Sequence, residues 1–160
     1  MPVLRDRVNW AGLALAAVML AGPAAACQVP DGAAAMRGQV ISWINAERQA
    51  SGLQPLRASA ALQKAATSHA CDMAERGFFA HKGPGGPEFT QRLRKSGYRY
   101  RAANENIAMT SSSSVVQVTS MWRDSPKHLD NVLDPKVREV GVGLAQIGDQ
   151  VFWVTNSGAS

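Results

Sequence analysis

Apolar residues recur every three or four positions in two long stretches near the start of the chain. This spacing predicts amphipathic helices over about 34–51 and from Ser59 to about Arg76. Serine is a favoured N-cap, and Gly52 and Gly77 stand where a helix can end in left-handed backbone. The sequence therefore predicts two helices joined by a short connection.

The second half of the chain mixes short helices with strands. A basic helix is predicted over about 88–96 and a strand over 103–109, and the serines at 111–114 and the Ser-Pro pair at 125–126 each favour a helix start. Alternating apolar residues around a Gly-Asp turn predict a hairpin over about 140–155. Because these elements follow no regular strand–helix–strand rhythm, we expect an α+β fold with a small, mainly antiparallel sheet flanked by helices.

The first 26 residues have the layout of a secretory signal. Two arginines precede an apolar run over 10–20, and Ala24 and Ala26 occupy the small positions before Cys27. The run is shorter than the roughly 20 residues that span a bilayer. We therefore expect a cleaved signal peptide over 1–26 and export to the periplasm or the cell exterior, not an integral membrane protein.

The rest of the chain divides into an N-terminal segment, 27–35, and one globular domain, 36–160. The net charge of +5 is mild, and no nucleic-acid-binding motif accompanies it, so we expect no nucleic-acid partner. Five basic residues nevertheless form a cluster with no acid between them: Arg92, Arg94, Lys95, Arg99 and Arg101. This cluster is either a solvated helix face or a contact with an anionic envelope surface.

Two cysteines follow the predicted signal. In an oxidising compartment Cys27 and Cys71 most simply form a disulfide, which would close a loop of about 44 residues. The alternative is a lipoprotein in which Cys27 carries the lipid and Cys71 stays a thiol. Ala24, where a lipobox usually has Leu, disfavours that alternative.

Glu105 is a carboxylate in apolar surroundings, because it shares a strand face with Ile107. An ionised carboxylate in such a place needs a partner. His81 and His128, at loop and helix-start positions, are the natural candidates. A third histidine, His69, borders the apolar stripe of the second helix and is expected to be packed and hydrogen-bonded.

Several short motifs occur in a characteristic order along residues 36–157. They are Asn45-Ala-Glu-Arg48 with Gly52-Leu-Gln-Pro-Leu56, His69-Ala-Cys-Asp-Met-Ala74, Phe79-Ala-His81, Glu105-Asn-Ile-Ala108, Trp122 with Ser125-Pro-Lys-His128 and Asn131-Val-Leu133, and Val140-Gly-Val-Gly143. In this order they resemble the bacterial type of the CAP (SCP/TAPS) superfamily of cysteine-rich secretory, antigen 5 and pathogenesis-related proteins. The resemblance implies a three-layer α-β-α sandwich with a central cleft.

The resemblance also implies a site in that cleft. In the family the cleft is lined by two histidines and acidic residues, and in some members it holds a divalent metal. His81, Glu105 and His128 match those positions and are the expected metal ligands, with zinc the most suitable cation. A second acidic position of the family is not matched here. Ser125 falls there, with Asp124 beside it, and both are expected to line the cleft.

Three functions are compatible with these residues. The first is a binding module that holds a metal and, by analogy with the family, a small or lipid ligand. The second is a hydrolase in which His128 is the general base for Ser125 and Glu105 orients it, or in which a metal activates water. The third is a polar cluster that only braces the core. Because no Gly-x-Ser-x-Gly elbow is present, we expect a binding module rather than an enzyme.

Overall fold

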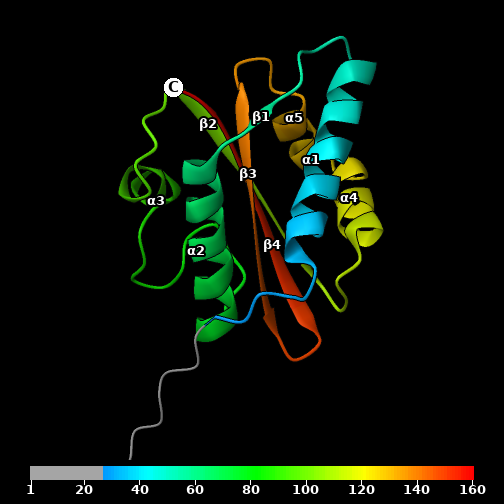
Figure 1. Cartoon of the computed structure of the whole chain (residues 1–160). Coiled ribbons are helices and arrows are strands. Elements are labelled where there is room, and N and C mark those ends of the chain that lie inside the picture. The colour runs from blue at the N-terminus through cyan, green and yellow to red at the C-terminus, as the bar shows by residue number, and fades with distance from the viewer. Residues whose placement is uncertain (1–26) are drawn as a thin grey trace, which may run out of the picture.

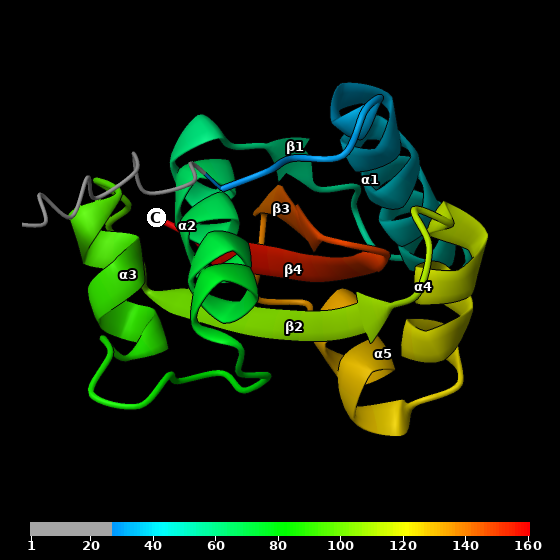
Figure 2. The same ribbon diagram turned by 90° about the horizontal axis from the view of Figure 1, so that it is seen from below.

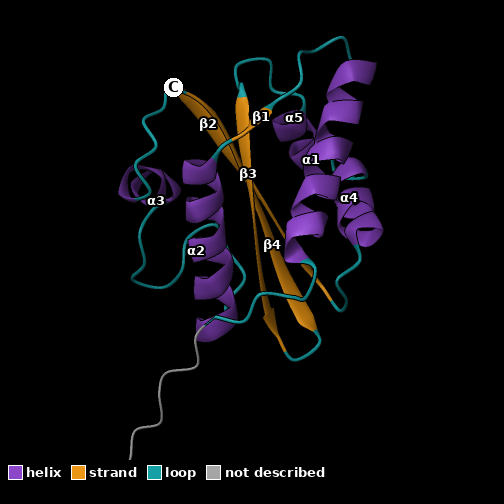
Figure 3. Cartoon of the chain, viewed as in Figure 1, coloured by secondary structure: helices purple, strands orange, loops and turns teal. Residues whose placement is uncertain are grey.

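The structure, a computed structural model, describes residues 27–160, and the predicted signal peptide lies outside them. The described elements follow one another as α1 (Ala33–Ala50), β1 (Arg57–Ala58), α2 (Ala60–Arg76), α3 (Phe89–Lys95), β2 (Ala102–Thr110), α4 (Val115–Arg123), α5 (Pro126–Val132), β3 (Glu139–Ile147) and β4 (Gln150–Ala159). Helices and strands thus form where the hydrophobic periodicity predicts them (Figure 3). The two-residue strand β1 was not predicted.

The four strands form one sheet in the order β1-β3-β4-β2. β1 runs parallel to β3, and the other two pairings are antiparallel. Figures 1 and 2 show α2, with α3 beside it, on one side of the sheet and α1, α4 and α5 on the other. The fold is therefore the expected three-layer α-β-α sandwich, and β2 is one of its edge strands.

The helix ends form as the capping residues predict. The Ser59 hydroxyl accepts a hydrogen bond from the Leu62 amide, and Gly77 ends α2 with φ of 66°. Ser114 likewise accepts from the Gln117 amide at 3.2 Å. Serine caps and a left-handed glycine thus set the ends of these helices.

β3 alternates valine with glycine, and each kind of residue faces a different layer. A Cβ added at Gly143 would lie 2.2 Å from the carbonyl carbon of Ala66, and one at Gly141 would lie 2.0 Å from the backbone nitrogen of Gln63. No real Cβ fits at such distances, so the backbone of α2 lies directly against the backbone of β3. Glycine is required here for close approach and not for a special backbone angle.

Apolar side chains fill both sides of the sheet. The core under α1, α4 and α5 is built mainly from Val40, Ile44, Val118, Trp122, Val140, Val142, Leu144 and Trp153. The thinner core under α2 is built mainly from Ala66, Ala70, Met73, Ile107, Ala145, Phe152 and Val154. The small residues on the α2 side follow from the close helix–strand contact.

A disulfide joins the first described residue to α2. Cys27 and Cys71 are bonded, with their Cα atoms 5.4 Å apart, which confirms the predicted pairing. The sulfur of Cys27 is therefore not free to carry a lipid. The next residue, Gln28, forms an isolated bridge with Gln146, so the N-terminal segment is attached to both α2 and β3.

No helix within residues 27–160 has the length and apolar character needed to cross a membrane.

The glycine contact gives a direct test of the packing. We expect Gly143→Ala to lower the free energy of unfolding by about 3 kcal/mol, because its methyl group must displace the backbone of α2. Gly38→Ala is the matched control, since Gly38 lies within α1 with nothing within 4 Å of an added Cβ. It should raise stability by about 0.5–1 kcal/mol through helix propensity. Urea denaturation measures both, and equal effects would contradict the proposed packing.

Candidate functional site

The partner of the buried carboxylate is an arginine as well as a histidine. Glu105 is 7% exposed on β2, and both of its oxygens accept hydrogen bonds from Nη2 of Arg92, at 2.9 Å for Oε1 and 2.7 Å for Oε2. Arg92 is itself only 6% exposed. Its assignment to a surface cluster was therefore wrong, because a buried carboxylate draws the guanidinium inward.

Asn156 adds a further donor to the same carboxylate. It lies opposite Glu105 in the β2–β4 register. In the amide orientation that satisfies both of its polar atoms, its nitrogen donates to Oε2 of Glu105 at 3.1 Å. The carboxylate is thus held both from the helix layer and from the neighbouring strand.

Arg92 also fixes the loop that carries His81. Its Nη1 donates to the carbonyl oxygens of His81, at 2.9 Å, and Pro87, at 3.0 Å. Residues 78–88 form no helix or strand. One guanidinium therefore connects α3, this loop and β2, and it holds the loop where regular backbone pairing does not.

The His81 ring contacts the same carboxylate. Its Nδ1 lies 3.0 Å from Oε1 of Glu105. Because a carboxylate accepts, Nδ1 carries the proton in this bond, and the neutral ring then has its lone pair on Nε2. The His81 side chain is 59% exposed, so this nitrogen belongs to a ring that solvent can reach.

His69 is buried behind this pair, as its place on the apolar stripe predicts. Its Nε2 donates to the Ala80 carbonyl at 2.9 Å and lies 3.9 Å from Oε1 of Glu105. Burial is the main cause that lowers the pKa of His69 below its usual value. The ring is a neutral, packed support for the loop, which agrees with the sequence prediction.

His128 lies in the first turn of α5, on the other side of β2. Its carbonyl accepts from the Asn106 side chain at 2.9 Å, while its own Nδ1 is buried with no hydrogen-bond partner among the described residues. Burial, and after it the charge of His81, lowers the pKa of His128. A positive charge on His81 would thus disfavour one on His128, and the His128 ring is neutral at pH 7.

The hydrolase alternative needs Glu105 to orient His128, and residues 27–160 show no hydrogen bond or ion pair between these two side chains. Neighbouring residues of a strand point to opposite faces, so Glu105 faces α2 and α3 while Asn106 faces α5. The carboxylate reaches His81 instead. Ser125 occupies the N-cap of α5 without a side-chain cap bond, and Asp124 is exposed at the end of α4.

No three His, Cys, Asp or Glu side chains within residues 27–160 are grouped so that together they could hold a metal ion. What the fold brings together is a chain of contacts from Arg92 through Glu105 to His81, with His128 nearby. The role of Arg92 was missed. The signal available in the sequence was its place between Phe89 and Ser96, on the inward stripe of a short helix that also carries the buried Leu93.

Sequence comparison places these residues in a family. The profile of the family described as "CAP: Cysteine-rich secretory protein family" matches residues 41–157, which include the whole set of site residues. The chain belongs to this family. The motif order that suggested the CAP superfamily is thus confirmed.

Two of the proteins similar to this CAP protein are named as an extracellular protein and an outer surface protein. The chain is 32% identical over 119 residues to the uncharacterized protein YkwD of Bacillus subtilis, covering 74% of itself and 46% of YkwD. An extracellular protein with an SCP domain from Bacillus anthracis is similar in structure, with a TM-score of 0.73, 24% identity, and coverage of 79% of this chain and 41% of that one. An outer surface protein of Borrelia burgdorferi gives a TM-score of 0.74 at 20% identity, covering 83% of this chain and 98% of that one.

The buried ion pair predicts a large loss of stability when only one partner is removed. Arg92→Met leaves the Glu105 carboxylate buried without its cation, and we expect the free energy of unfolding to fall by about 3–5 kcal/mol. Arg94→Gln, an exposed neighbour on α3, should change it by less than about 0.5 kcal/mol. In urea denaturation, Arg92→Met with Glu105→Leu should recover part of the loss. If Arg92→Met and Arg94→Gln lowered the free energy of unfolding by the same amount, burial of Arg92 would be contradicted.

The buried His69 predicts a pH dependence of stability. A histidine whose pKa is lower in the folded than in the unfolded state binds more protons when unfolded, so the free energy of unfolding decreases as pH falls below about 6.5. His69→Gln keeps a donor for the Ala80 carbonyl but cannot titrate. We expect the loss of stability between about pH 7 and about pH 5 to be smaller in His69→Gln than in the wild type. An unchanged loss in denaturation at each pH would show that His69 is not buried in its neutral form.

Proposed function

We propose that this CAP protein is an extracellular, non-catalytic binding module in which His81 and His128 hold a divalent metal, with zinc the best candidate. The observation that carries the proposal is the hydrogen bond between His81 Nδ1 and Glu105 Oε1. Metal-binding histidines commonly donate their other ring N–H to a carboxylate, which fixes the ring and raises its basicity as a ligand. His81 has this arrangement.

Glu105 is assigned to orientation and not to metal coordination. Both of its oxygens accept from Arg92, and Oε1 also accepts from His81. A carboxylate so engaged has little capacity left for a cation. The proposal therefore replaces the three-ligand set of His81, Glu105 and His128 with two imidazoles and a supporting carboxylate.

His128 suits the second ligand position because its neutral form is favoured. Burial and the charge of His81 lower its pKa. A metal binds neutral imidazole, and a bound proton must leave first. Because the pKa of His128 is lowered, removing that proton near pH 6 costs less free energy than it does for a free histidine. The lack of a partner for its buried Nδ1 within residues 27–160 leaves the ring without a competing hydrogen bond at that atom.

Two protein ligands leave positions open for a small or lipid ligand. When bound, zinc would supply a Lewis acid able to attract an oxygen or nitrogen of that ligand. Phe79, two residues before His81, is 48% exposed and offers an apolar surface close in sequence to the imidazole. The proposal thus includes a ligand with a polar group for the metal and an apolar part for Phe79.

Calorimetric titration with zinc chloride tests the proposal. We expect the wild type to bind zinc, and His81→Ala and His128→Ala to weaken binding by more than about tenfold each, since each removes one ligand. Lys127→Ala, which removes an exposed side chain beside His128, should leave the affinity unchanged. Equal heats from the wild type and both histidine variants would end the metal proposal.

A hydrolase is the second candidate because the Ser125 hydroxyl makes no cap bond to α5 and is therefore available. It is distinguished by turnover of peptide, ester or cell-wall substrates that Ser125→Ala abolishes. The absence of any carboxylate contact to His128 among the described residues disfavours a triad.

A further inference from the structure

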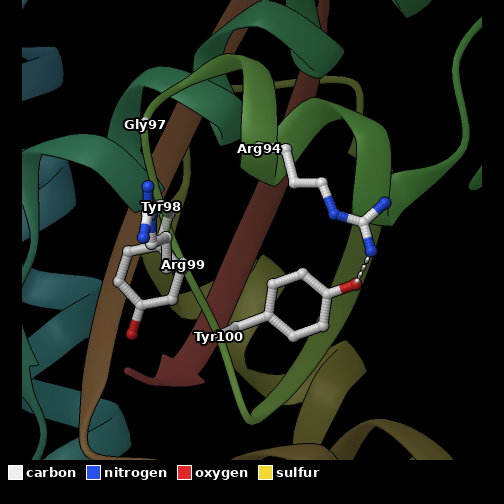
Figure 4. A pocket seen from close by; sticks show the side chains of 5 residues that line it. All are labelled: Arg94, Gly97, Tyr98, Arg99 and Tyr100. Carbon is white, nitrogen blue, oxygen red and sulfur yellow. Dashed lines mark hydrogen bonds between the residues drawn. The ribbon is translucent and has the colours of Figure 1, made fainter.

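The end of α3 and the segment after it form a hollow on the surface, away from the two imidazoles. It is lined by Arg94, Gly97, Tyr98, Arg99 and Tyr100, with a volume of about 630 Å³ (Figure 4). Gly97 has φ of 89°, which turns the chain sharply after the helix. The residues that follow therefore run back beside the last turn of α3.

Arg94 and Tyr100 form one wall as a pair. The Arg94 guanidinium carbon lies 5.7 Å from the centre of the Tyr100 ring, and its Nη2 donates to the tyrosine hydroxyl at 3.3 Å. Figure 4 shows the two side chains extending toward each other. The contact holds the guanidinium at the ring, so that the remaining N–H groups of a rigid fork stay available.

Tyr98 also lines the hollow but is only 5% exposed, and contacts beneath its ring hold it in place. Its hydroxyl donates to Oε2 of Glu139 at 2.7 Å, and its ring fills the space that a side chain at residue 158 would need. The Glu139 carboxylate is also 3.8 Å from the Arg57 guanidinium. This carboxylate is thus already paired beneath the ring and does not neutralise the arginines of the hollow.

The positive charge at the hollow has no carboxylate partner. With Arg92 turned inward, Arg94 and Arg99 are the cations that line the hollow, and neither forms a salt bridge with any residue that the structure describes. Cations on a protein surface are commonly interspersed with carboxylates. Here the two arginines lie with the half-buried ring of Tyr100 and the buried ring of Tyr98 instead.

From this combination we infer that the hollow binds an anionic sugar group, such as a uronic acid unit of an envelope or extracellular glycan. Guanidinium forks match planar carboxylates with two parallel hydrogen bonds. The accessible face of a tyrosine ring offers an apolar surface for the C–H face of a sugar, and its hydroxyl offers hydrogen bonds. One anionic sugar uses both features.

A lipid surface is the less suitable partner. Among residues 27–160, the large apolar side chains that are exposed all lie elsewhere: Val29, Phe79, Met109, Val116, Met121 and Ile147. A membrane-binding surface usually adds apolar side chains that enter the headgroup region to its positive charge. The segment from 89 to 101 has the charge without those side chains.

Isothermal titration with hexagalacturonate at low ionic strength tests the inference. We expect binding that the neutral, fully methyl-esterified hexamer does not show. Arg94→Gln should weaken binding at least about fivefold by removing the fork, whereas Lys127→Gln, an equal change of charge on α5, should weaken it less than about twofold. Equal losses in both variants would show attraction to overall charge and would overturn the site.

The aromatic wall is tested separately. Tyr100→Phe keeps the ring but loses the hydroxyl that Arg94 contacts, so it should weaken binding less than Tyr100→Ser, which should lose about fivefold or more. Circular dichroism confirms that each variant is folded. Equal affinities of Tyr100→Ser and the wild type would overturn the role of the ring.

Vesicles of phosphatidylglycerol and phosphatidylcholine form the last arm. Arg94-dependent binding to the vesicles with none to the hexamer would overturn the sugar assignment in favour of a lipid surface. The zinc titration is independent of every arm, because the hollow shares no residue with His81 and His128.

Discussion

The buried pair of Arg92 and Glu105 is the interaction on which the site depends. A carboxylate inside a sandwich is expensive to bury, and its burial is offset here by a guanidinium that is itself almost inaccessible. The same guanidinium binds the carbonyl groups of His81 and Pro87, so residues 78–88 take their conformation from a side chain and not from backbone pairing. The arginine of the ion pair therefore holds this loop in place, as backbone hydrogen bonds hold a strand in a sheet.

The geometry of the sheet explains why a charged group in one layer can affect a group in the other. Gly141 and Gly143 allow α2 to lie against β3, so the layer that holds Glu105 is thin, while the opposite layer is filled by large side chains. β2 lies at the edge of the sheet, and a loop from one layer can pass around it toward the other. Figure 2 shows the segment after α2 passing below β2 in that view before it turns back to α3. His128 is thereby within the electrostatic influence of His81, although the two belong to opposite faces.

The sequence predicts most of the fold because its local signals are strong. Ser59 and the glycine ends define helices, and the last two strands alternate around a tight turn. It does not predict β1, because a two-residue strand with both residues exposed leaves no hydrophobic pattern. It predicts that Glu105 needs a partner, but not that Arg92 is that partner, because the pairing depends on how α3 packs against α2. A stripe of Phe89, Arg92 and Leu93 marks the inward face of α3, yet neighbouring arginines make the whole helix look solvated.

The strand order has a consequence for how the protein assembles. β2 is hydrogen-bonded only to β4, and β4 also lies against β3, so the strand that comes last along the chain occupies the interior of the sheet. A growing polypeptide therefore cannot close the sandwich until residues 150–159 have been synthesised. Until then β2 has no hydrogen-bonded neighbour among the described strands, so the sheet of this domain is completed by the strand that is made after all the others.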